Sequence, residues 1–90
     1  MIYTLEVSKT FKKQFKRLSK ADANLVFSVL DKLLNDIPLP AKNHDHELHG
    51  DYKGTRECHI KPDLLLIYQK KESVLILTAL AIGNHSELFS

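Results

Sequence analysis

Histidine is the residue type in this sequence with the clearest potential for chemistry. His44, His46, His49 and His59 lie within sixteen residues, and His85 lies near the end of the chain. An imidazole has an ordinary pKa of roughly 6.5, so it can accept or donate a proton near neutral pH. The sequence therefore predicts acid–base chemistry, on the condition that the fold brings these separated segments together.

A metal site is one alternative for the stretch 44–49, which also contains Asp45 and Glu47. Its spacing matches neither the His-x-x-x-His pattern of helical zinc sites nor a Cys/His finger. On a strand, His44 and His46 would share one face, but two ligands do not make a site. We therefore expect no metal and no other cofactor.

Cleavage of RNA at its own 2′-hydroxyl is the second chemistry open to these residues. It needs a base for the 2′-hydroxyl proton, an acid for the leaving 5′-oxygen, and cations that stabilise the phosphorane. Histidine suits both proton transfers and Arg56 suits the phosphate, with His59 and either His46 or His85 completing the set. On a strand over 55–60, Glu57 and His59 project together, so the carboxylate would orient the imidazole.

Basic residues gather at the start of the chain. Residues 1–20 contain six of the thirteen Lys and Arg residues and one acid, so this segment carries +5, while the whole chain carries +2. Lys12, Lys13 and Lys16 fall on a short predicted helix. They form either a solvated face or a surface for the phosphates of a polyanionic partner, and nothing in this segment separates RNA from DNA.

The first half of the chain predicts one strand and two helices. Residues 2–7 alternate in polarity, which predicts a strand, and Ser8 follows as a candidate N-cap. Apolar residues at 11, 15 and 18 mark one face of a short helix. The apolar stripe over 21–36 predicts a second helix that ends before Pro38, with Asp22 as its cap or first-turn acid.

The second half predicts a loop and three strands. Residues 38–52 show no clear period and predict a loop, with a short extended stretch at 45–48. The three strands are expected over 55–60, 64–69 and 74–82, joined by turns at 61–63 and 70–73. Gly83 and Asn84 end the third strand, and residues 85–90 close the chain.

The order β-α-α-β-β-β indicates an α+β fold, in which an antiparallel sheet carries an N-terminal helical hairpin on one face. Ninety residues leave room for one domain, over residues 1–90. The single cysteine, Cys58, excludes an internal disulfide, and no apolar run reaches the roughly 18 residues of a membrane span. The N-terminus has no signal-like pattern, so we expect a soluble cytoplasmic protein without a membrane partner.

Three separated blocks of the sequence resemble the YafQ-type branch of the RelE/ParE toxin superfamily. The blocks are Asp45-His46-Glu47-Leu48, followed by Gly50; Tyr52-Lys53-Gly54-x-Arg56-Glu57-x-His59-Ile60-x-Pro62-Asp63-Leu64-x-Leu66-Ile67-Tyr68; and Gly83-x-His85-Ser86-Glu87-Leu88-Phe89. The resemblance spans essentially the whole chain, and the predicted β-α-α-β-β-β order matches the family's fold. It implies a bacterial type II toxin that cleaves messenger RNA without a metal, usually in the ribosomal A site, and that a cognate antitoxin binds and inhibits.

The resemblance also implies a catalytic set. The family's catalytic positions are occupied by His46, His59, Asp63, His85 and Phe89. His85 would be the general acid, and His46 or His59 the base toward the 2′-hydroxyl. A further position, where many members have Asp, is Glu57 here, which keeps the charge on a side chain longer by one methylene.

The same resemblance implies residues that bind the substrate. Arg56 matches the arginine that would hold the scissile phosphate, and Lys53 lies in the same block. Tyr52 stands where close relatives often have Trp, and with Phe89 it would stack on or wall the flanking bases. Lys12, Lys13 and Lys16 would then face ribosomal RNA.

Two other functions stay open on the sequence alone. One is a ParE-like protein of the same fold that binds gyrase and cuts nothing. The histidine blocks argue against it, because a gyrase binder has no evident need for them. The other is a non-catalytic partner of an antitoxin, which represses its own operon and reaches operator DNA only through that antitoxin.

Overall fold

The computed structural model describes residues 2–89, so residues 1 and 90 of the predicted 1–90 domain lie outside the described residues. The helices and strands confirm the α+β class and the predicted order. The extended stretch expected within 45–48 is present as a short strand, and the structure adds a C-terminal helix. In chain order they are β1 (Thr4–Val7), α1 (Lys9–Phe15), α2 (Lys20–Leu34), β2 (His46–Glu47), β3 (Arg56–Lys61), β4 (Leu64–Lys71), β5 (Ile76–Gly83) and α3 (His85–Phe89). Within 2–89, no helix is both long enough and apolar enough to cross a membrane.

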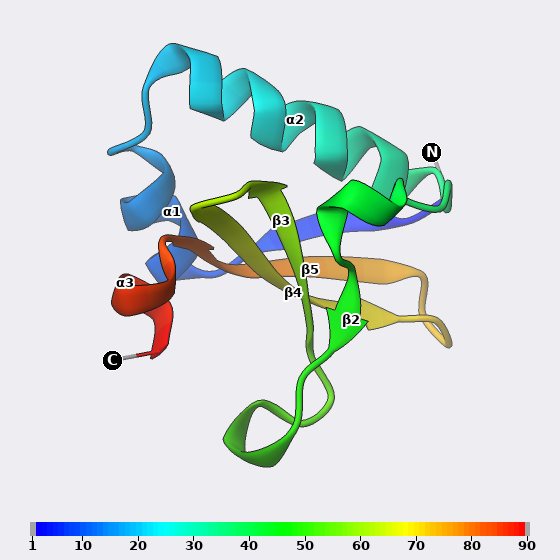
Figure 1. Ribbon diagram of the computed structural model, residues 1–90. Helices are drawn as coiled ribbons and strands as arrows, with labels where there is room; N and C mark the ends of the chain where they lie inside the picture. Colours follow the sequence, from blue (N-terminus) through cyan, green and yellow to red (C-terminus); the bar gives the residue numbers. More distant parts are fainter. Residues whose placement is uncertain (1, 90) are drawn as a thin grey trace.

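The strands form one sheet in the order β1-β5-β4-β3-β2 (Figure 1). The predicted antiparallel meander of β3, β4 and β5 is confirmed. β1 differs from the expected antiparallel arrangement, because it pairs with β5 in parallel and makes the sheet mixed. A hairpin turn can join only antiparallel strands, but the long chain between β1 and β5 leaves either direction open to that pair.

Two serine caps build the helical hairpin. The Ser8 hydroxyl accepts a hydrogen bond from the Phe11 amide at 2.9 Å and donates to the Leu80 carbonyl on β5 at 2.7 Å, so α1 is fastened to the sheet at its first turn. Ser19 caps α2 through the amide of Asp22, which confirms Asp22 as a first-turn acid. The predicted helix over 21–36 ends early, at Leu34, because Asp36 adopts a left-handed conformation with φ of 56°.

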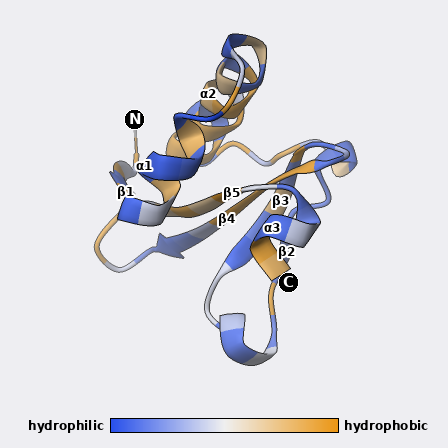
Figure 2. Ribbon diagram, turned by 90° about the vertical axis from the view of Figure 1, so that its left-hand side faces the viewer, coloured by the Kyte–Doolittle hydropathy of each residue, from blue (hydrophilic) through white to orange (hydrophobic). Residues whose placement is uncertain are grey.

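The main core lies between α2 and one face of the sheet. The buried side of α2 packs with the central strands, and Figure 2 shows how hydrophobic β4 and β5 are over much of their length. The core contains Val26, Val29, Leu30, Leu33 and Leu34 of α2 with Cys58, Leu66, Leu77 and Ala79 of the sheet. Because successive side chains on a strand alternate between faces, Glu57 and His59 leave β3 on the side away from this core.

Candidate active site

Glu57 is the centre of the histidine cluster. It lies on β3, only 6% exposed, and its Oε1 is 3.6 Å from Nε2 of His46 and 3.8 Å from Nε2 of His59. The register explains this contact, since His46 on β2 lies directly opposite Glu57 and opposed residues share one face. Each imidazole can compensate the charge of this buried carboxylate when it is protonated.

Two buried apolar side chains of the neighbouring strand β4 lie beside this cluster. Leu65 and Ile67 on β4 lie opposite His59 and Glu57 and are 2% and 3% exposed. Because water is excluded from this side of the cluster, charges placed on it interact more strongly than they would in bulk solvent.

The segment before β2 fixes the orientation of the His46 ring. His44 takes a left-handed conformation with φ of 47°, and its carbonyl oxygen hydrogen-bonds to Nδ1 of His46. A carbonyl can only accept, so Nδ1 carries the proton and Nε2 of the neutral ring is unprotonated. That free nitrogen is the one that faces Glu57.

His44 also contacts the site. Its ring packs edge-on against His59, with 5.3 Å between the ring centroids. The buried Asn43 side chain donates a 2.7 Å hydrogen bond to the His59 carbonyl, which ties this turn to β3. Beside His59 lies a hollow of about 570 Å³, whose lining includes Lys42 and Lys61. No sequence motif marks these two lysines, and only their proximity to the histidine segments hints at them.

A short helix carries His85 and Phe89. The Asn84 side chain accepts from the Glu87 amide at 2.8 Å, and the Glu87 carboxylate accepts from the Asn84 amide at 2.9 Å. This reciprocal capping box begins α3, and the pattern Asn84-x-x-Glu87 was the sequence signal that could have predicted the helix. The His85 and Phe89 rings pack with centroids 4.9 Å apart.

Tyr52 joins this aromatic group from a distant loop. Its ring lies edge-on to Phe89 with 5.3 Å between centroids, and its hydroxyl donates to the Leu88 carbonyl at 3.3 Å. Because the loop that contains Tyr52 follows β2, this contact ties α3 to the β2–β3 part of the sheet. The structure thus brings Tyr52, His85 and Phe89 together.

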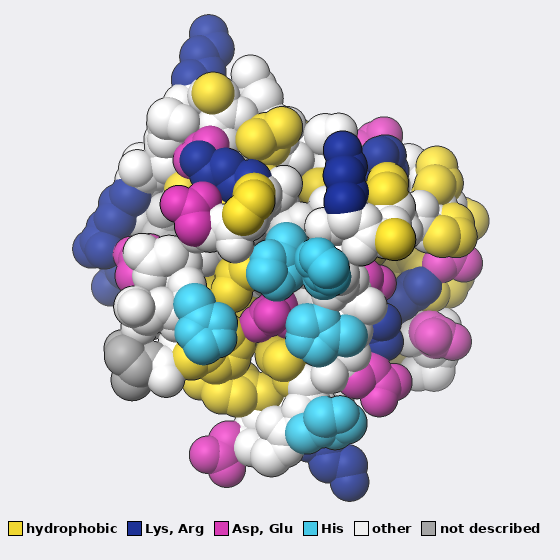
Figure 3. All heavy atoms as spheres, in the orientation of Figure 1, with side chains coloured by type: hydrophobic (Ala, Val, Ile, Leu, Met, Phe, Trp, Pro, Cys, Tyr) yellow, Lys and Arg dark blue, Asp and Glu magenta, His cyan; other side chains and the backbone are white. Residues whose placement is uncertain are grey.

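The sheet register places the start of α3 two strands away from His59. Gly83, two residues before His85, lies opposite Leu65, which lies opposite His59. Two strand spacings amount to roughly 10 Å. Figure 3 shows histidine side chains gathered on one face around an acidic side chain. Histidines from two separate segments, His46 and His59, therefore meet at Glu57, and the helix that carries His85 begins two strands away from His59.

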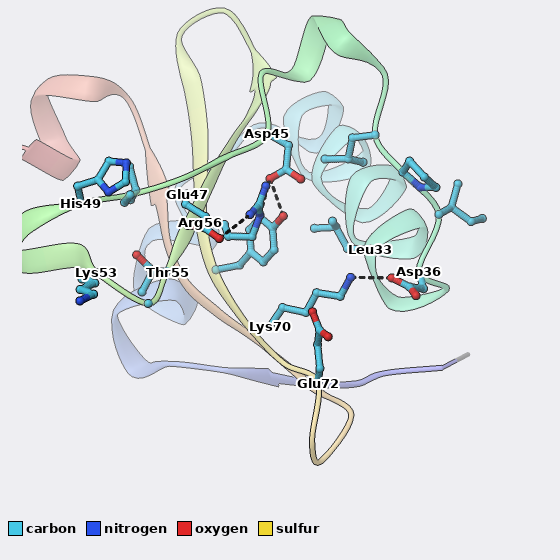
Figure 4. Close-up of a pocket in the computed structure, with 16 residues that line it drawn as sticks. Leu33, Asp36, Asp45, Glu47, His49, Lys53, Thr55, Arg56, Lys70 and Glu72 are labelled. Carbon is cyan, nitrogen blue, oxygen red and sulfur yellow. Dashed lines mark hydrogen bonds and ion pairs between the residues drawn. The ribbon is translucent and has the colours of Figure 1, made fainter.

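Arg56 does not join this face. Its side chain leaves β3 on the opposite side, where Nε lies 3.3 Å from Oδ1 of Asp45 and Nη1 lies 3.7 Å from Oε1 of Glu47 (Figure 4). Burial lowers the pKa of Arg56, but hydrogen bonds to Tyr68 and Asp45 outweigh that effect and raise it overall.

Two other expected site residues lie outside the Glu57 cluster. Lys53 lines, together with Arg56, a hollow of about 680 Å³ below the end of α2. Asp63 is exposed in the turn between β3 and β4, four residues beyond His59. Neither residue contacts Glu57 through an ion pair among the described residues.

The basic helix α1 lies beside the end of β5. The Gln14 side chain accepts a 2.8 Å hydrogen bond from the Ile82 amide, immediately before the chain enters α3. Lys12, Lys13 and Lys16 of this helix are all exposed. Over residues 2–89, no group of three or more His, Cys, Asp or Glu side chains has the arrangement of a metal site.

A family model described as "Bacterial toxin of type II toxin-antitoxin system, YafQ" matches residues 3–90. The chain belongs to the YafQ toxin family. The assignment made from the three sequence blocks is therefore confirmed. The enzyme class that it implied, an mRNA interferase, is the one that relatives carry in their names.

Two curated members of the YafQ family illustrate the likeness. The "mRNA interferase toxin YafQ" of Escherichia coli strain K12 is 35% identical over 88 residues, which cover 94% of each chain. The "Putative toxin YafQ" of Haemophilus influenzae is 42% identical over 67 residues, which cover 69% of this chain and 66% of that protein.

Solved structures of the family share the fold. A metal-bound toxin from Helicobacter pylori is 46% identical, covers 97% of this chain and 99% of its own, and superposes with a TM-score of 0.88. YafQ in the E. coli DinJ–YafQ toxin–antitoxin complex is 33% identical with full coverage of both chains and a TM-score of 0.87.

Proposed function

We propose that this toxin is an endoribonuclease that cleaves messenger RNA by histidine acid–base chemistry, without a metal, on the ribosome. The observation that carries the proposal is the pair of imidazoles of His46 and His59 at 3.6 Å and 3.8 Å from the Glu57 carboxylate. The relatives named mRNA interferase toxin support the choice of substrate.

His46 fits the role of general base. The hydrogen bond from Nδ1 to the His44 carbonyl leaves Nε2 free to take the 2′-hydroxyl proton. The imidazolium that forms then lies 3.6 Å from a carboxylate, which stabilises the new charge. His59, on the other side of the same carboxylate, orients Glu57 and is the second candidate base.

His85 would act as the general acid. The 2′-oxygen attacks phosphorus as His46 takes its proton, and the P–O5′ bond breaks as protonated His85 donates a proton to the leaving oxygen. The products are a 2′,3′-cyclic phosphate and a 5′-hydroxyl, and no outside proton donor is needed. Lys42 beside His59 would offset the charge on the phosphorane.

The aromatic pair Tyr52 and Phe89 would hold the flanking bases, since single-stranded RNA is commonly recognised by stacking. The lysines of α1 would contact phosphates of ribosomal RNA, which carry no sequence information but fix the orientation of the toxin. Asp63 and Lys53 would contact the RNA farther along its path.

A cognate antitoxin is the expected protein partner. The E. coli relative forms a solved complex with the antitoxin DinJ, and this chain matches the YafQ part of that complex over its full length. Such a toxin would work in the cytoplasm, where its ribosomal target is found, and would reach operator DNA only through the antitoxin.

The test is cleavage of messenger RNA on purified ribosomes by the intact chain and by His85→Ala. We expect a loss of at least 100-fold in cleavage for His85→Ala. The matched control is His49→Ala, because His49 lines the other hollow and not the Glu57 cluster. Equal cleavage by all three proteins would overturn the mechanism.

Four further measurements separate the alternatives. Cleavage that survives EDTA agrees with metal-free chemistry, and cleavage lost in EDTA and restored by a metal ion contradicts it. Cleavage of free RNA at the ribosomal rate contradicts ribosome dependence. Intact messenger together with inhibited gyrase would favour the ParE-like function, and retained growth on induction would favour the non-catalytic one.

A further inference from the structure

Asp45, the residue that precedes His46, belongs to a polar cluster on the face of the sheet opposite Glu57. Oδ1 of Asp45 accepts a hydrogen bond from the Tyr68 hydroxyl at 2.6 Å and another from Nε of Arg56 at 3.3 Å. Tyr68 is 1% exposed and lies directly opposite Arg56 in the register of β3 and β4. Figure 4 shows Arg56 lying between Asp45 and Glu47 on this side of the sheet.

The chemistry of the cluster makes Asp45 difficult to move. Burial, together with the Asp45 carboxylate, raises the pKa of Tyr68 far above its ordinary value, so the hydroxyl stays a donor. The Arg56 guanidinium is always protonated and is likewise only a donor. Hydrogen bonds to an ionised acceptor are roughly twice as strong as neutral ones, and a buried tyrosine hydroxyl has no water to replace the carboxylate.

Asp45 and His46 are consecutive, and their side chains contact opposite sides of the sheet. The first contacts Tyr68 and Arg56, and the second contacts Glu57. β2 contains only two residues and lies at the edge of the sheet, so main-chain pairing with β3 holds it weakly. An anchor on one side of so short a strand sets the position of the neighbouring side chain on the other.

We propose that Asp45, which accepts hydrogen bonds from Tyr68 and Arg56, is the positioning residue that holds His46 beside Glu57. The proposal rests on the proposed function for its catalytic consequence. In this proposal Arg56 holds Asp45 on the opposite side of the sheet from Glu57, in place of the phosphate contact expected from the sequence. A displacement of about 1 Å at a catalytic group can lower a rate by about 100-fold, so the anchor matters even though it touches no substrate.

Tyr68→Phe tests the proposal, because it removes one donor and keeps the ring. We expect the cleavage rate at saturating ribosomes to fall about 10- to 100-fold, with a much smaller change in KM. The matched control is Tyr3→Phe, which removes the hydroxyl of another buried tyrosine, outside the cluster. The expected cleavage rate of that variant is within twofold of the unchanged protein.

A double-mutant cycle separates positioning from general destabilisation. If Tyr68 acts through His46, adding Tyr68→Phe to His46→Ala lowers cleavage by less than about twofold further. If the second substitution costs its full factor in that background, the proposal is overturned. Cleavage by folded Tyr68→Phe at the rate of the unchanged protein would also overturn it.

NMR spectra of the His46 ring supply a readout that needs no activity. We expect the ring nitrogen resonances of His46 to move in Tyr68→Phe and in Asp45→Ala and to stay in place in Tyr3→Phe. Unmoved His46 resonances in folded Tyr68→Phe would contradict the anchor. If the intact protein cuts no RNA, the proposed function fails, but these resonances still decide whether Asp45 positions His46.

Discussion

Nε2 of His59 lies 3.8 Å from Oε1 of Glu57, and both side chains leave the same face of β3. The same carboxylate oxygen contacts His46, so one buried acid serves two imidazoles. A unit charge pair at about 4 Å is worth roughly 4 kcal/mol at an effective dielectric constant of 20. One carboxylate offsets one imidazolium but not two, which suits a site where a single proton is taken up in each turnover.

Replacement of Glu57 by Gln should slow cleavage strongly and leave the fold intact. The amide keeps the shape but loses the charge that stabilises the imidazolium formed on the base. General acid–base groups contribute about 10²- to 10⁴-fold to rates, so we expect kcat to fall roughly 10²-fold in ribosome-dependent cleavage.

The matched control for this substitution is Glu47→Gln. Glu47 lies next to His46 in sequence, but its side chain is 74% exposed and pairs with Arg56 at 3.7 Å. Exposed ion pairs contribute about 0–1 kcal/mol, so kcat should stay within a few-fold. A larger loss for Glu47→Gln than for Glu57→Gln would refute the central role of Glu57.

Removal of the Phe89 ring should weaken substrate binding more than it slows the chemical step. Stacking of one base on an aromatic ring is worth about 1–3 kcal/mol, so Phe89→Ala should raise KM by about 10-fold or more. Tyr52→Phe keeps the ring contact with Phe89 and loses only a 3.3 Å hydrogen bond, so its KM should be nearly unchanged. Steady-state kinetics with programmed ribosomes measures both values, and equal effects of the two variants would count against stacking.

Neutralisation of the basic helix should reduce both binding to ribosomes and its salt dependence. Each lost phosphate contact lowers the slope of log K against log salt by roughly 0.7–0.9, so Lys12→Ala with Lys13→Ala should lower it by about 1.5. A charge-matched control is Lys32→Ala with Lys71→Ala, which removes the same charge from other parts of the surface. Titrations of ribosomes at several salt concentrations measure the slopes, and identical slopes for the two pairs would mean that α1 has no special contact.

Cys58 should make the protein less stable in mild alkali. Burial, followed by the charges of Asp45 and Glu57, raises the pKa of Cys58 to about 12. An unfolded thiol ionises at roughly pH 8.5, so above that pH the unfolded state binds fewer protons than the folded state, and stability falls. The slope approaches about 1.4 kcal/mol per pH unit, which gives a loss of about 2 kcal/mol by pH 10.

Urea denaturation of the intact protein and of Cys58→Ala between pH 8 and pH 10 measures this loss. The intact protein should lose stability steeply over this range, and the variant should lose much less. Parallel curves for the two proteins would show that the Cys58 thiol is not held protonated by the fold.

The sequence by itself determined the elements and their chemistry. Hydrophobic periodicity located α1, α2 and the three strands of the meander, because helices and strands bury side chains with different spacings. Ser8 was identified as a cap, and the capping contact with Phe11 confirms it. Alternation along β3 placed Glu57 and His59 on one face, since this placement depends only on the period of a strand.

Only the tertiary structure decided which distant residues meet. The register of β2 against β3 placed His46 opposite Glu57, and a one-residue slip would have sent His46 to the other face. The parallel pairing of β1 with β5 and the contact of Tyr52 with Phe89 likewise depend on long-range packing. Arg56 is the clearest case, because only the fold brings Asp45 and Tyr68 to its side chain as partners.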